Sequence, residues 1–568
     1  MLLSNFNLLA TAPGGVTRLR ELILTLAVQG KLVPQDPGDE PASVLLRKIR
    51  TEKDRLILGG KIRQDKPLAK IAKEEKPFEV PTGWTWVHAL DVCALITDGD
   101  HQAPPKATSG ISFLVIGDVR DGSIDLENAS RFVPLSYFEA LHWSKQPCIG
   151  DVLYTTVGSF GIPVPVIEQQ NFCFQRHIAL FRPAITKLQG FLALVLRSSL
   201  AFQQAEKGAT GIAQKTVPLS VLRELTLPLP PLAEQFRIVT RVEELMCVCD
   251  ALEVKGKLEA AEHARLVSTL LGTLTGSGTP EALAQNWQRI AVHFDLLLDR
   301  PQAIDAFEKT ILQLAVRGLL VPQDPKDEPA SVLLQKISAE KDRLILEGKI
   351  KRDKPLQPVA DEEKPFEVPQ GWGWVRIDEI AEVQGGIQKT QLRRPIKEHY
   401  PYLRVANVQR DALRLGEIER FELTKEELAK WRLSAGDLLI VEGNGSADEI
   451  GRCAVWTGEI NPCVYQNHLI RLRCVQSAFI AFTKLFLNAP SGTDEMKRLA
   501  ITTSGLYNLS VGKIRNFVVP VPPLTEQFRI VARVEELRRL CADLRQRVSA
   551  SQTTQAHLAE ALVESVAA

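Results

Sequence analysis

The sequence predicts an α/β protein built as an internal repeat, in which two α/β domains are separated by two long, antiparallel coiled-coil helices with pseudo-twofold symmetry. Two observations show that the sequence repeats. Residues 26–87 return as residues 314–375 with 47 of 62 positions identical, and residues 227–245 return as 519–537 with 15 of 19 identical. We call these repeated segments the frame. Two copies of one frame present the same surface twice.

The third observation is that the segments between the frame copies do not repeat. Residues 88–226 and 376–518 are 139 and 143 residues long and share only scattered positions. In both, short apolar runs alternate with turns, which predicts compact α/β domains with strands near residues 113–119, 151–157, 177–181, 402–408, 437–441 and 468–472. The expected organisation is a helical region 1–87, a variable domain 88–226, a central region with a long helix 227–375, a second variable domain 376–518 and a C-terminal helix 519–568.

Apolar residues at alternating spacings of four and three predict the long helices. This spacing is a heptad seam, and it recurs in phase in both copies. Prolines up to Pro231 fix the first helix start near Leu232, and the helix reaches about Leu271, or roughly 60 Å. The second runs from Leu524 to about Leu562. Locally the seam is ordinary bundle core, and its members are Ile238, Val242, Leu245, Leu252, Ile530, Val534, Leu537 and Leu544.

Shorter helices precede the variable domains. One helix in each copy ends at Gly30 or Gly318, in the C′ position that favours a left-handed residue. The next helices are expected at residues 42–58 and 330–346. The composition of residues 272–280 predicts a flexible linker.

Composition places the chain among soluble globular proteins of about three or four domains. It has 568 residues, 45% hydrophobic and 24% charged, with a net charge of +1. No apolar run reaches the roughly 20 residues that cross a bilayer, and no signal peptide is recognisable. Nine cysteines without paired spacing favour a reducing cytoplasm and no metal site.

Sequence motifs of catalysis are missing. The Gly-Lys pairs are all followed by Leu or Ile, so no phosphate-binding loop is predicted. Asn461-Pro462-Cys463 lacks the pattern of an adenine methyltransferase, and the acidic residues around Asp324 and Glu340 lie in turns and on a solvated helix face. We expect no catalytic residue.

The segments PLPPLAEQ and PVPPLTEQ, together with LAVQGKLVPQDPGDEPAS and LAVRGLLVPQDPKDEPAS, resemble the specificity subunits of type I restriction–modification systems. The resemblance covers nearly the whole chain. It implies two target-recognition domains, each reading one half of a bipartite double-stranded DNA site, and repeated helices that dock two methyltransferase (modification) subunits. It also implies that this chain binds no cofactor directly. S-adenosylmethionine, ATP and Mg would be used by the methyltransferase and by the restriction or translocase subunits of the full complex.

Loop residues in the variable domains have the side-chain types that contact bases and phosphates. Each could instead be a turn former or a solvated side chain, and His177 and His468 could be core histidines. Candidates in the first domain are His101, Gln102, Lys106, Gly158, Ser159, Gln175, Arg176, Gln214 and Lys215. Those in the second are Gln388, Lys389, Thr390, Arg393, Arg394, Arg404, Asn407, Asn444, Ser446, Asn467, Tyr507 and Asn508.

Two alternatives remain open. A protein-interaction scaffold without sequence reading would use the same helices, and it would show weak salt dependence, whereas phosphate contacts give a steep one. A stand-alone nuclease would require a metal-dependent site that the sequence does not display.

Overall fold

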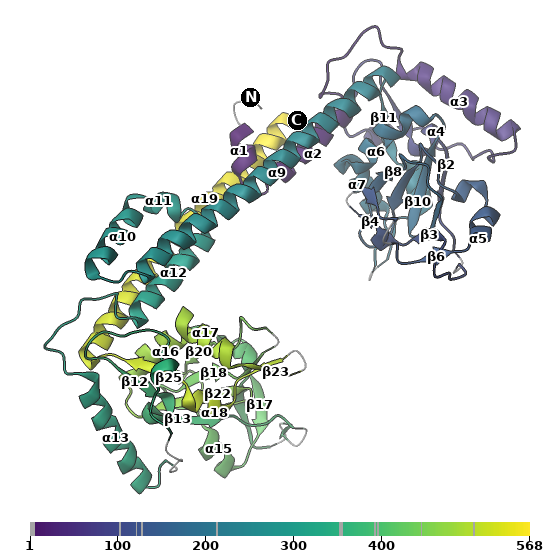
Figure 1. Ribbon diagram of the computed structural model, residues 1–568. Helices are drawn as coiled ribbons and strands as arrows, with labels where there is room; N and C mark the ends of the chain where they lie inside the picture. The colour runs from purple at the N-terminus through teal and green to yellow at the C-terminus, as the bar shows by residue number, and fades with distance from the viewer. Residues whose placement is uncertain are drawn as a thin grey trace. The chain divides into compact units, whose positions relative to one another are not determined.

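The computed structural model describes residues 6–101, 104–120, 122–126, 129–211, 214–350, 356–390, 393–394, 397–444, 446–503 and 506–567. The chain forms two compact units (Figure 1). Unit 1 comprises Met1–Glu259 and Gln552–Ala568, and unit 2 comprises Ala260–Ser551. Two 44-residue helices, α9 (Leu232–Thr275) and α19 (Leu524–Ala567), each contribute a part to both units. Within the described ranges no helix is long and apolar enough to cross a membrane.

Unit 1 surrounds the first variable segment. Its other helices are α1 (Phe6–Thr11), α2 (Gly15–Val28), α3 (Ala42–Leu58), α4 (Ala89–Val92), α5 (Leu135–Ala140), α6 (Gln189–Arg197), α7 (Ser199–Gly208) and α8 (Leu219–Glu224). Its strands are β1 (Thr85–His88), β2 (Cys93–Asp98), β3 (Ile111–Leu114), β4 (Val119–Arg120), β5 (Ser123–Ile124), β6 (Phe132–Val133), β7 (Val152–Thr155), β8 (Pro163–Pro165), β9 (Phe172–Phe174), β10 (Ile178–Pro183) and β11 (Thr226–Leu229).

Unit 2 surrounds the second variable segment. Its other helices are α10 (Pro280–Val292), α11 (Phe294–Leu297), α12 (Pro301–Val316), α13 (Ala330–Leu346), α14 (Ile377–Ile380), α15 (Lys425–Trp431), α16 (Phe479–Asn488), α17 (Pro490–Leu499) and α18 (Val511–Asn516). Its strands are β12 (Gly373–Arg376), β13 (Ala381–Gly385), β14 (His399–Leu403), β15 (Val408–Gln409), β16 (Ala412–Leu413), β17 (Glu419–Glu422), β18 (Leu438–Val441), β19 (Gly443–Asn444), β20 (Cys453–Val455), β21 (Val464–Tyr465), β22 (Leu469–Cys474), β23 (Ile501–Thr503), β24 (Leu506–Asn508) and β25 (Val518–Val521).

The two variable segments fold with the same strand order. An antiparallel sheet β2-β10-β7-β8 in unit 1 corresponds to β13-β22-β18-β20 in unit 2. A second sheet, β6-β3-β9 or β17-β14-β21, contains one parallel pair in each unit. Each segment starts and ends on a two-stranded frame sheet, β1 with β11 or β12 with β25. The predicted α/β character of both segments is therefore observed.

The strands predicted near residues 113–119 and 402–408 end earlier than expected. β3 ends at Leu114 and β14 ends at Leu403, and each is followed by a 3-10 turn, Ile116–Asp118 or Val405–Asn407. In both turns the side chain of the last residue accepts a backbone N–H: Asp118 Oδ2 from Val115 at 2.7 Å, and Asn407 Oδ1 from Arg404 at 2.9 Å. This side-chain cap competes with the sheet ladder.

The predicted linker at residues 272–280 is also partly wrong. α9 continues through Thr275, so the first four of these residues are helical. Thr279 then caps α10, because its hydroxyl oxygen accepts the backbone N–H of Ala282 at 3.2 Å.

The repeated frame has the same buried polar clamp in each unit. Trp84 Nε1 donates to Glu234 Oε2 at 2.9 Å and Gln35 Nε2 to Glu234 Oε1 at 2.7 Å. In unit 2 the corresponding distances, from Trp372 and Gln323 to Glu526, are 3.0 and 2.7 Å. Burial raises the pKa of both glutamates above the usual range.

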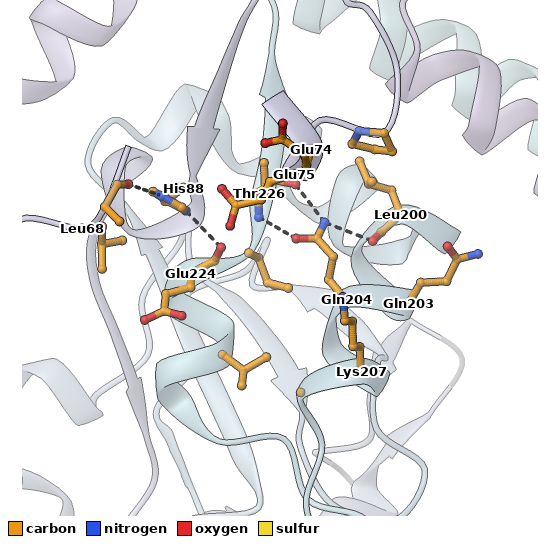
Figure 2. A pocket seen from close by; sticks show the side chains of 15 residues that line it. Leu68, Glu74, Glu75, His88, Leu200, Gln203, Gln204, Lys207, Glu224 and Thr226 are labelled. Carbon is orange, nitrogen blue, oxygen red and sulfur yellow. Dashed lines mark hydrogen bonds between the residues drawn. The ribbon is translucent and has the colours of Figure 1, made fainter. Parts of the chain in front are cut away.

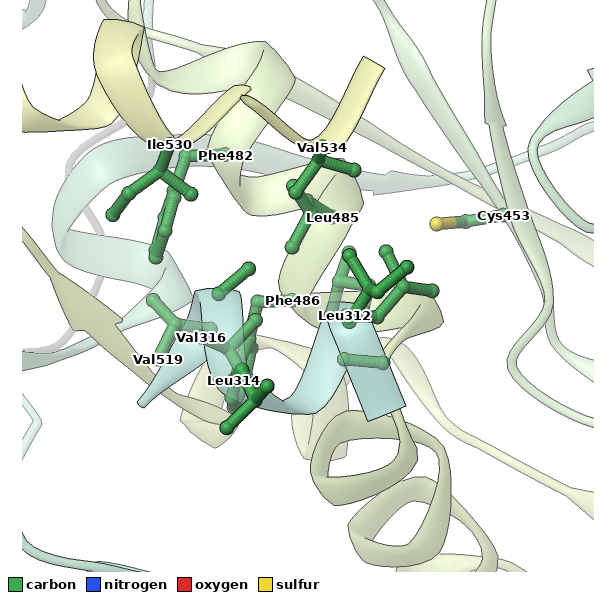
Figure 3. Close-up of a cluster of buried hydrophobic side chains, with 14 of the residues drawn as sticks. Leu312, Leu314, Val316, Cys453, Phe482, Leu485, Phe486, Val519, Ile530 and Val534 are labelled. Atoms are coloured by element: carbon green, nitrogen blue, oxygen red, sulfur yellow. The ribbon is translucent and has the colours of Figure 1, made fainter. Parts of the chain in front are cut away.

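Four residues of the predicted seam, Ile238, Val242, Ile530 and Val534, are buried. In unit 1 the first turns of α9 and the last turns of α19 share one core, through Ile238, Val242 and Ala559. In unit 2, Leu271 of α9 lies in one core with Ile530 and Val534 of α19, the last two of which are labelled in Figure 3. Leu245, Leu252, Leu537 and Leu544 pack against these cores as partly buried residues.

Candidate nucleic-acid interface

Loops that are distant in sequence meet at one edge of the main sheet in unit 1. Because the strands are antiparallel, the ends of β2 and β7 lie beside the start of β10. Gly99 N donates to Ile178 O at 3.3 Å, and Thr156 N donates to His177 O at 3.0 Å. The frame sheet joins the opposite edge, where Ala184 N donates to Val92 O at 3.0 Å. The loop edge therefore faces away from the frame.

A turn from the end of the variable segment completes this cluster. Gly158 N donates to Lys215 O at 3.0 Å, and Val217 N donates to Thr156 O at 2.8 Å. A Cβ on Gly158 would lie 3.4 Å from Gln214 Nε2, so the Gln214 side chain lies over this glycine. We call residues 98–101, 156–159, 175–177 and 214–215 the loop cluster of unit 1.

Unit 2 builds the same cluster from different residues. Ile387 N donates to Tyr465 O at 2.9 Å, and Asn467 N donates to Ile387 O at 2.8 Å. Glu442 N donates to His468 O at 2.9 Å, and Leu509 N donates to Glu442 O at 2.8 Å. We call residues 385–390, 442–444, 466–468 and 507–508 the loop cluster of unit 2.

A glycine lets two loops touch at the same point in each cluster. A Cβ on Gly99 would lie 2.0 Å from Phe174 O, and one on Gly386 would lie 2.2 Å from Gln466 O. Real Cβ atoms do not approach a carbonyl oxygen this closely. Both positions therefore require glycine for space, and both clusters depend on it.

Most candidates of unit 1 lie in its cluster, with differing side-chain engagement. His101 Nε2 lies 2.8 Å from Asp98 Oδ2, Lys215 Nζ donates to Glu206 Oε1 at 3.0 Å, and Gln175 Nε2 contacts His177 Nδ1 at 3.0 Å. Ser159, Arg176 and Gln214 are exposed. Lys106 is exposed beside Ala107, which pairs with β6 outside the cluster, and Gln102 lies outside the described residues. Burial, and then the adjacent Arg176, lower the pKa of His177.

In unit 2 several basic candidates are held by carboxylates. Lys389 Nζ donates to Glu419 at 2.8 Å, and Arg393 donates to Glu427 at 2.9 Å. Arg404 contacts Glu417 and Glu419 at 3.0 and 2.9 Å. These ion pairs leave fewer donors free for a phosphate than the sequence suggested.

The remaining candidates of unit 2 are mostly exposed. Gln388, Thr390, Arg394 and Asn508 are exposed, and Asn467 and Tyr507 are half-buried. Ser446 starts a turn in which its carbonyl accepts from Glu449 N at 3.2 Å. The backbone of Asn444 pairs with Tyr507, whereas its side chain is not among the described atoms. His468 is exposed and His177 half-buried, so neither is a core histidine.

Asn407 requires a correction. It is 3% exposed, and its amide nitrogen donates to Arg414 O and Glu417 O at 2.7 and 2.9 Å while its oxygen caps the turn. Both of its amide N–H groups and one acceptor site of its oxygen are used inside the domain. The structure assigns Asn407 a structural role in place of the predicted DNA contact.

Sequence reasoning missed Glu442. Its backbone lies at the centre of the unit 2 cluster, and burial raises the pKa of its carboxyl group to about 7. A signal was available, because a charged residue follows directly on the four buried residues of β18. The corresponding position in unit 1 is Thr156.

A cavity of about 760 Å³ lies on the frame side of unit 1 (Figure 2). The ring nitrogens of His88 lie 3.0 Å from Glu224 O and from Ala69 O. Gln204 exchanges two hydrogen bonds with the backbone of Thr226, at 2.8 and 2.9 Å. His88 thereby links Ala69, in the segment before β1, to Glu224 at the end of α8, and Gln204 links α7 to β11. In unit 2, Arg376 occupies the position that corresponds to His88, and its Nε donates to Gln357 O at 2.8 Å.

Exposed apolar side chains on the frame and its helices recur in matched pairs. Phe236 and Phe528 occupy the same place in the first turns of α9 and α19, at 49% and 58% exposure. Leu58 and Leu346 end α3 and α13 at 89% and 87% exposure. Further pairs are Val248 with Leu540 and Leu266 with Leu558. No group of three or more metal-ligating side chains was found among the residues that the structure describes.

Comparison with known proteins gives the family. A family described as "Type I restriction modification DNA specificity domain" matches residues 102–263 and 369–551. The specificity subunits of the type I restriction enzymes EcoEI and EcoAI of Escherichia coli are each 35% identical to this chain, with 97% of this chain and 93% of the relative covered. The HsdS subunit from Thermoanaerobacter tengcongensis is a solved relative with a TM-score of 0.38 and 18% identity over 86% of this chain and 98% of that one. The chain belongs to the specificity subunits of type I restriction–modification systems.

Proposed function

We propose that this chain is the sequence-specific DNA-recognition subunit of a type I restriction–modification complex. Each variable domain reads one half of a bipartite target with its loop cluster. The observation that carries the proposal is the pair of clusters, which share one backbone arrangement and differ in side chains. One arrangement with two sets of side chains reads two different half-sites, which gives an asymmetric target.

The side chains divide the work of binding. Exposed Arg176 and Arg394 suit phosphates or guanine, and amide side chains such as Gln214 and Gln388 suit adenine edges. Two domains on one chain raise the effective concentration for the second contact once the first half-site is bound. The antiparallel helices α9 and α19, acting as a coiled-coil spacer, set the distance between half-sites.

The frame docks two methyltransferase subunits in this proposal. Its exposed apolar pairs, Phe236 with Phe528 and Leu58 with Leu346, offer equivalent contacts to two copies of one partner. The chain itself is non-catalytic. S-adenosylmethionine, ATP and Mg are used by the methyltransferase and by the restriction or translocase subunits, which make the complex an adenine-specific methyltransferase and ATP-dependent endonuclease.

A genome-wide map of methylated adenines tests the proposal. Cells that carry the cognate methyltransferase should show a split motif only when this chain is present. Exchanging residues 88–226 for those of another specificity subunit should change one half of the motif and keep the other. An unchanged methylation pattern with and without the chain would overturn the proposal.

The scaffold alternative predicts a different binding experiment. A scaffold would bind the methyltransferase without DNA sequence preference. The proposed reader binds its site at least a thousandfold tighter than random DNA, and its affinity falls steeply between about 50 and 200 mM salt.

A further inference from the structure

Glu442 occupies the position in unit 2 where four loops converge. It follows β18 directly, its N–H donates to His468 O at 2.9 Å, and its carbonyl accepts from Leu509 N at 2.8 Å. These bonds hold its backbone between the turn at residues 466–468 and the β23–β24 hairpin. The position is therefore fixed by the sheet, as a reading side chain requires.

The direction of the side chain follows from the strand. Leu438 and Ile440 face the large core of unit 2, whereas Leu439 and Val441 face the smaller core on the other side of the sheet. By this alternation Glu442 continues the first row, on the side where Leu509 and Tyr507 pack.

The carboxylate has no partner among the residues that the structure describes. Among the described residues no hydrogen bond or ion pair reaches either oxygen of Glu442, although Lys389, Arg393 and Arg404 of the same domain all have carboxylate partners. Burial alone raises its pKa to about 7. A half-buried carboxylate without a partner weakens the free protein and repels phosphates. A ligand that donates a hydrogen bond would remove that cost.

We propose that Glu442 is a specificity-determining residue of unit 2, whose carboxylate accepts a hydrogen bond from an exocyclic amino group of a base, N4 of cytosine or N6 of adenine, in the half-site that this unit reads. This inference rests on the proposed function. Those amino groups are the base donors that a major-groove acceptor meets. Unit 1 has Thr156 in the corresponding place, so its half-site lacks this contact.

Binding to DNA with a randomised second half-site tests the inference. The complete complex with the methyltransferase is used, as wild type, Glu442→Ala, Glu442→Gln and the control Glu426→Gln. Glu426 is an exposed carboxylate on α15 of the same unit and is not a member of the loop cluster. Glu442→Ala should lose preference at one base-pair position of the second half-site by about tenfold or more. The first half-site and the control should keep the wild-type preferences.

Modified bases then distinguish the two amino groups. At the affected position, cytosine is replaced by pyrimidin-2-one, which lacks the 4-amino group, or adenine by purine, which lacks the 6-amino group. Removing the amino group that Glu442 contacts should weaken binding by the wild-type protein about tenfold. It should not affect binding by Glu442→Ala, because this variant already lacks the contact.

Three results would overturn the inference. Both Glu442 variants could keep the wild-type second half-site; they could bind every sequence more tightly, as relief of phosphate repulsion predicts; or they could lose both half-sites together, as misfolding predicts. Failure of the proposed function looks different, because the wild-type complex would then select no bipartite site.

Discussion

At the scale of single residues, burial raises the pKa of three glutamates in the part of the chain that the structure describes, and these glutamates differ in their partners. Glu234 and Glu526 are 1% exposed and each accepts two side-chain hydrogen bonds. Glu442 accepts none from the described residues. The first two are therefore structural, and the third is available to a ligand.

The clamp around Glu234 should be a large local contribution to stability. Glu234→Ala leaves the indole N–H of the buried Trp84 without a partner and removes one of the two acceptors of Gln35 Nε2, which keeps Gly30 O. We expect the free energy of unfolding to fall by about 2–4 kcal/mol, measured by urea denaturation of unit 1 signals. Glu526→Ala should do the same in unit 2. A change below about 0.5 kcal/mol in both variants would contradict the role of the clamp.

Glu442 should make stability depend on pH. Its folded pKa of about 7 lies above the ordinary value near 4.3, so the folded state binds the proton more tightly. Stability should therefore fall as pH rises from about 4.5 to 7 and level off above 7. We expect a loss of about 1 kcal/mol, discounted for partial solvent exposure. Glu442→Gln, compared with wild type by urea unfolding at pH 5 and pH 8, should lack this component. Equal pH slopes in the two proteins would contradict it.

At the scale of elements, the sequence predicted what local chemistry decides. The helices at residues 42–58 and 330–346 have the predicted bounds, and the long helices start at Leu232 and Leu524 because prolines precede them. The glycines Gly30 and Gly318 follow their helices at φ +70° and +71°, as predicted.

Gly30 lends itself to a matched test. A Cβ there would lie 2.6 Å from Pro81 Cγ and 2.9 Å from Trp84 Cζ2, whereas one on Gly60, at φ +66°, would meet nothing within 4 Å. Gly60→Ala should cost about 1 kcal/mol for its left-handed backbone alone. Gly30→Ala should cost at least about 2 kcal/mol more, because the overlap with proline and tryptophan adds to it. Thermal unfolding of both variants measures the difference, and equal costs would contradict the clash.

The sequence could not predict which distant segments come together in the fold. The side-chain type of Asn407 suited adenine, but nothing local indicates that Arg414 O and Glu417 O converge on its amide. The partners of Lys389 and Arg404 lie 15 to 30 residues away, at Glu419. The loop clusters form because β2 pairs with β10 and β13 with β22, across some 80 residues of chain. Pairing order across such distances is set by packing of the whole domain.

At the scale of the whole molecule, the frame presents the same exposed apolar residues twice, whereas the loop clusters of the two variable domains differ. A duplicated surface should bind its partner with a stoichiometry that follows the number of intact copies. This expectation can be tested without touching either loop cluster.

Phe236→Glu should reduce the methyltransferase subunits bound per chain from two to one, and so should Phe528→Glu. The double variant should bind none, because the charge would be buried at both contacts. Native mass spectrometry counts the subunits. Val254→Glu is the control, since Val254 is 66% exposed and has Gln546 as its counterpart. Two subunits still bound to the double variant would exclude these phenylalanines as contacts.

Because the two frames are nearly identical, a strand of one frame can pair with a strand of the other while the chain folds. β1 and β12 carry the same Trp-Val pair, and β11 and β25 share their alternating apolar and proline pattern, so β1 could pair with β25 almost as well as with β11. During synthesis, β11 leaves the ribosome some 290 residues before β25, which at typical rates is roughly 15 to 60 s. The first frame can close in that interval, before its competitor exists. Refolding from denaturant removes this order, so crossed pairings between frames compete with the native one there.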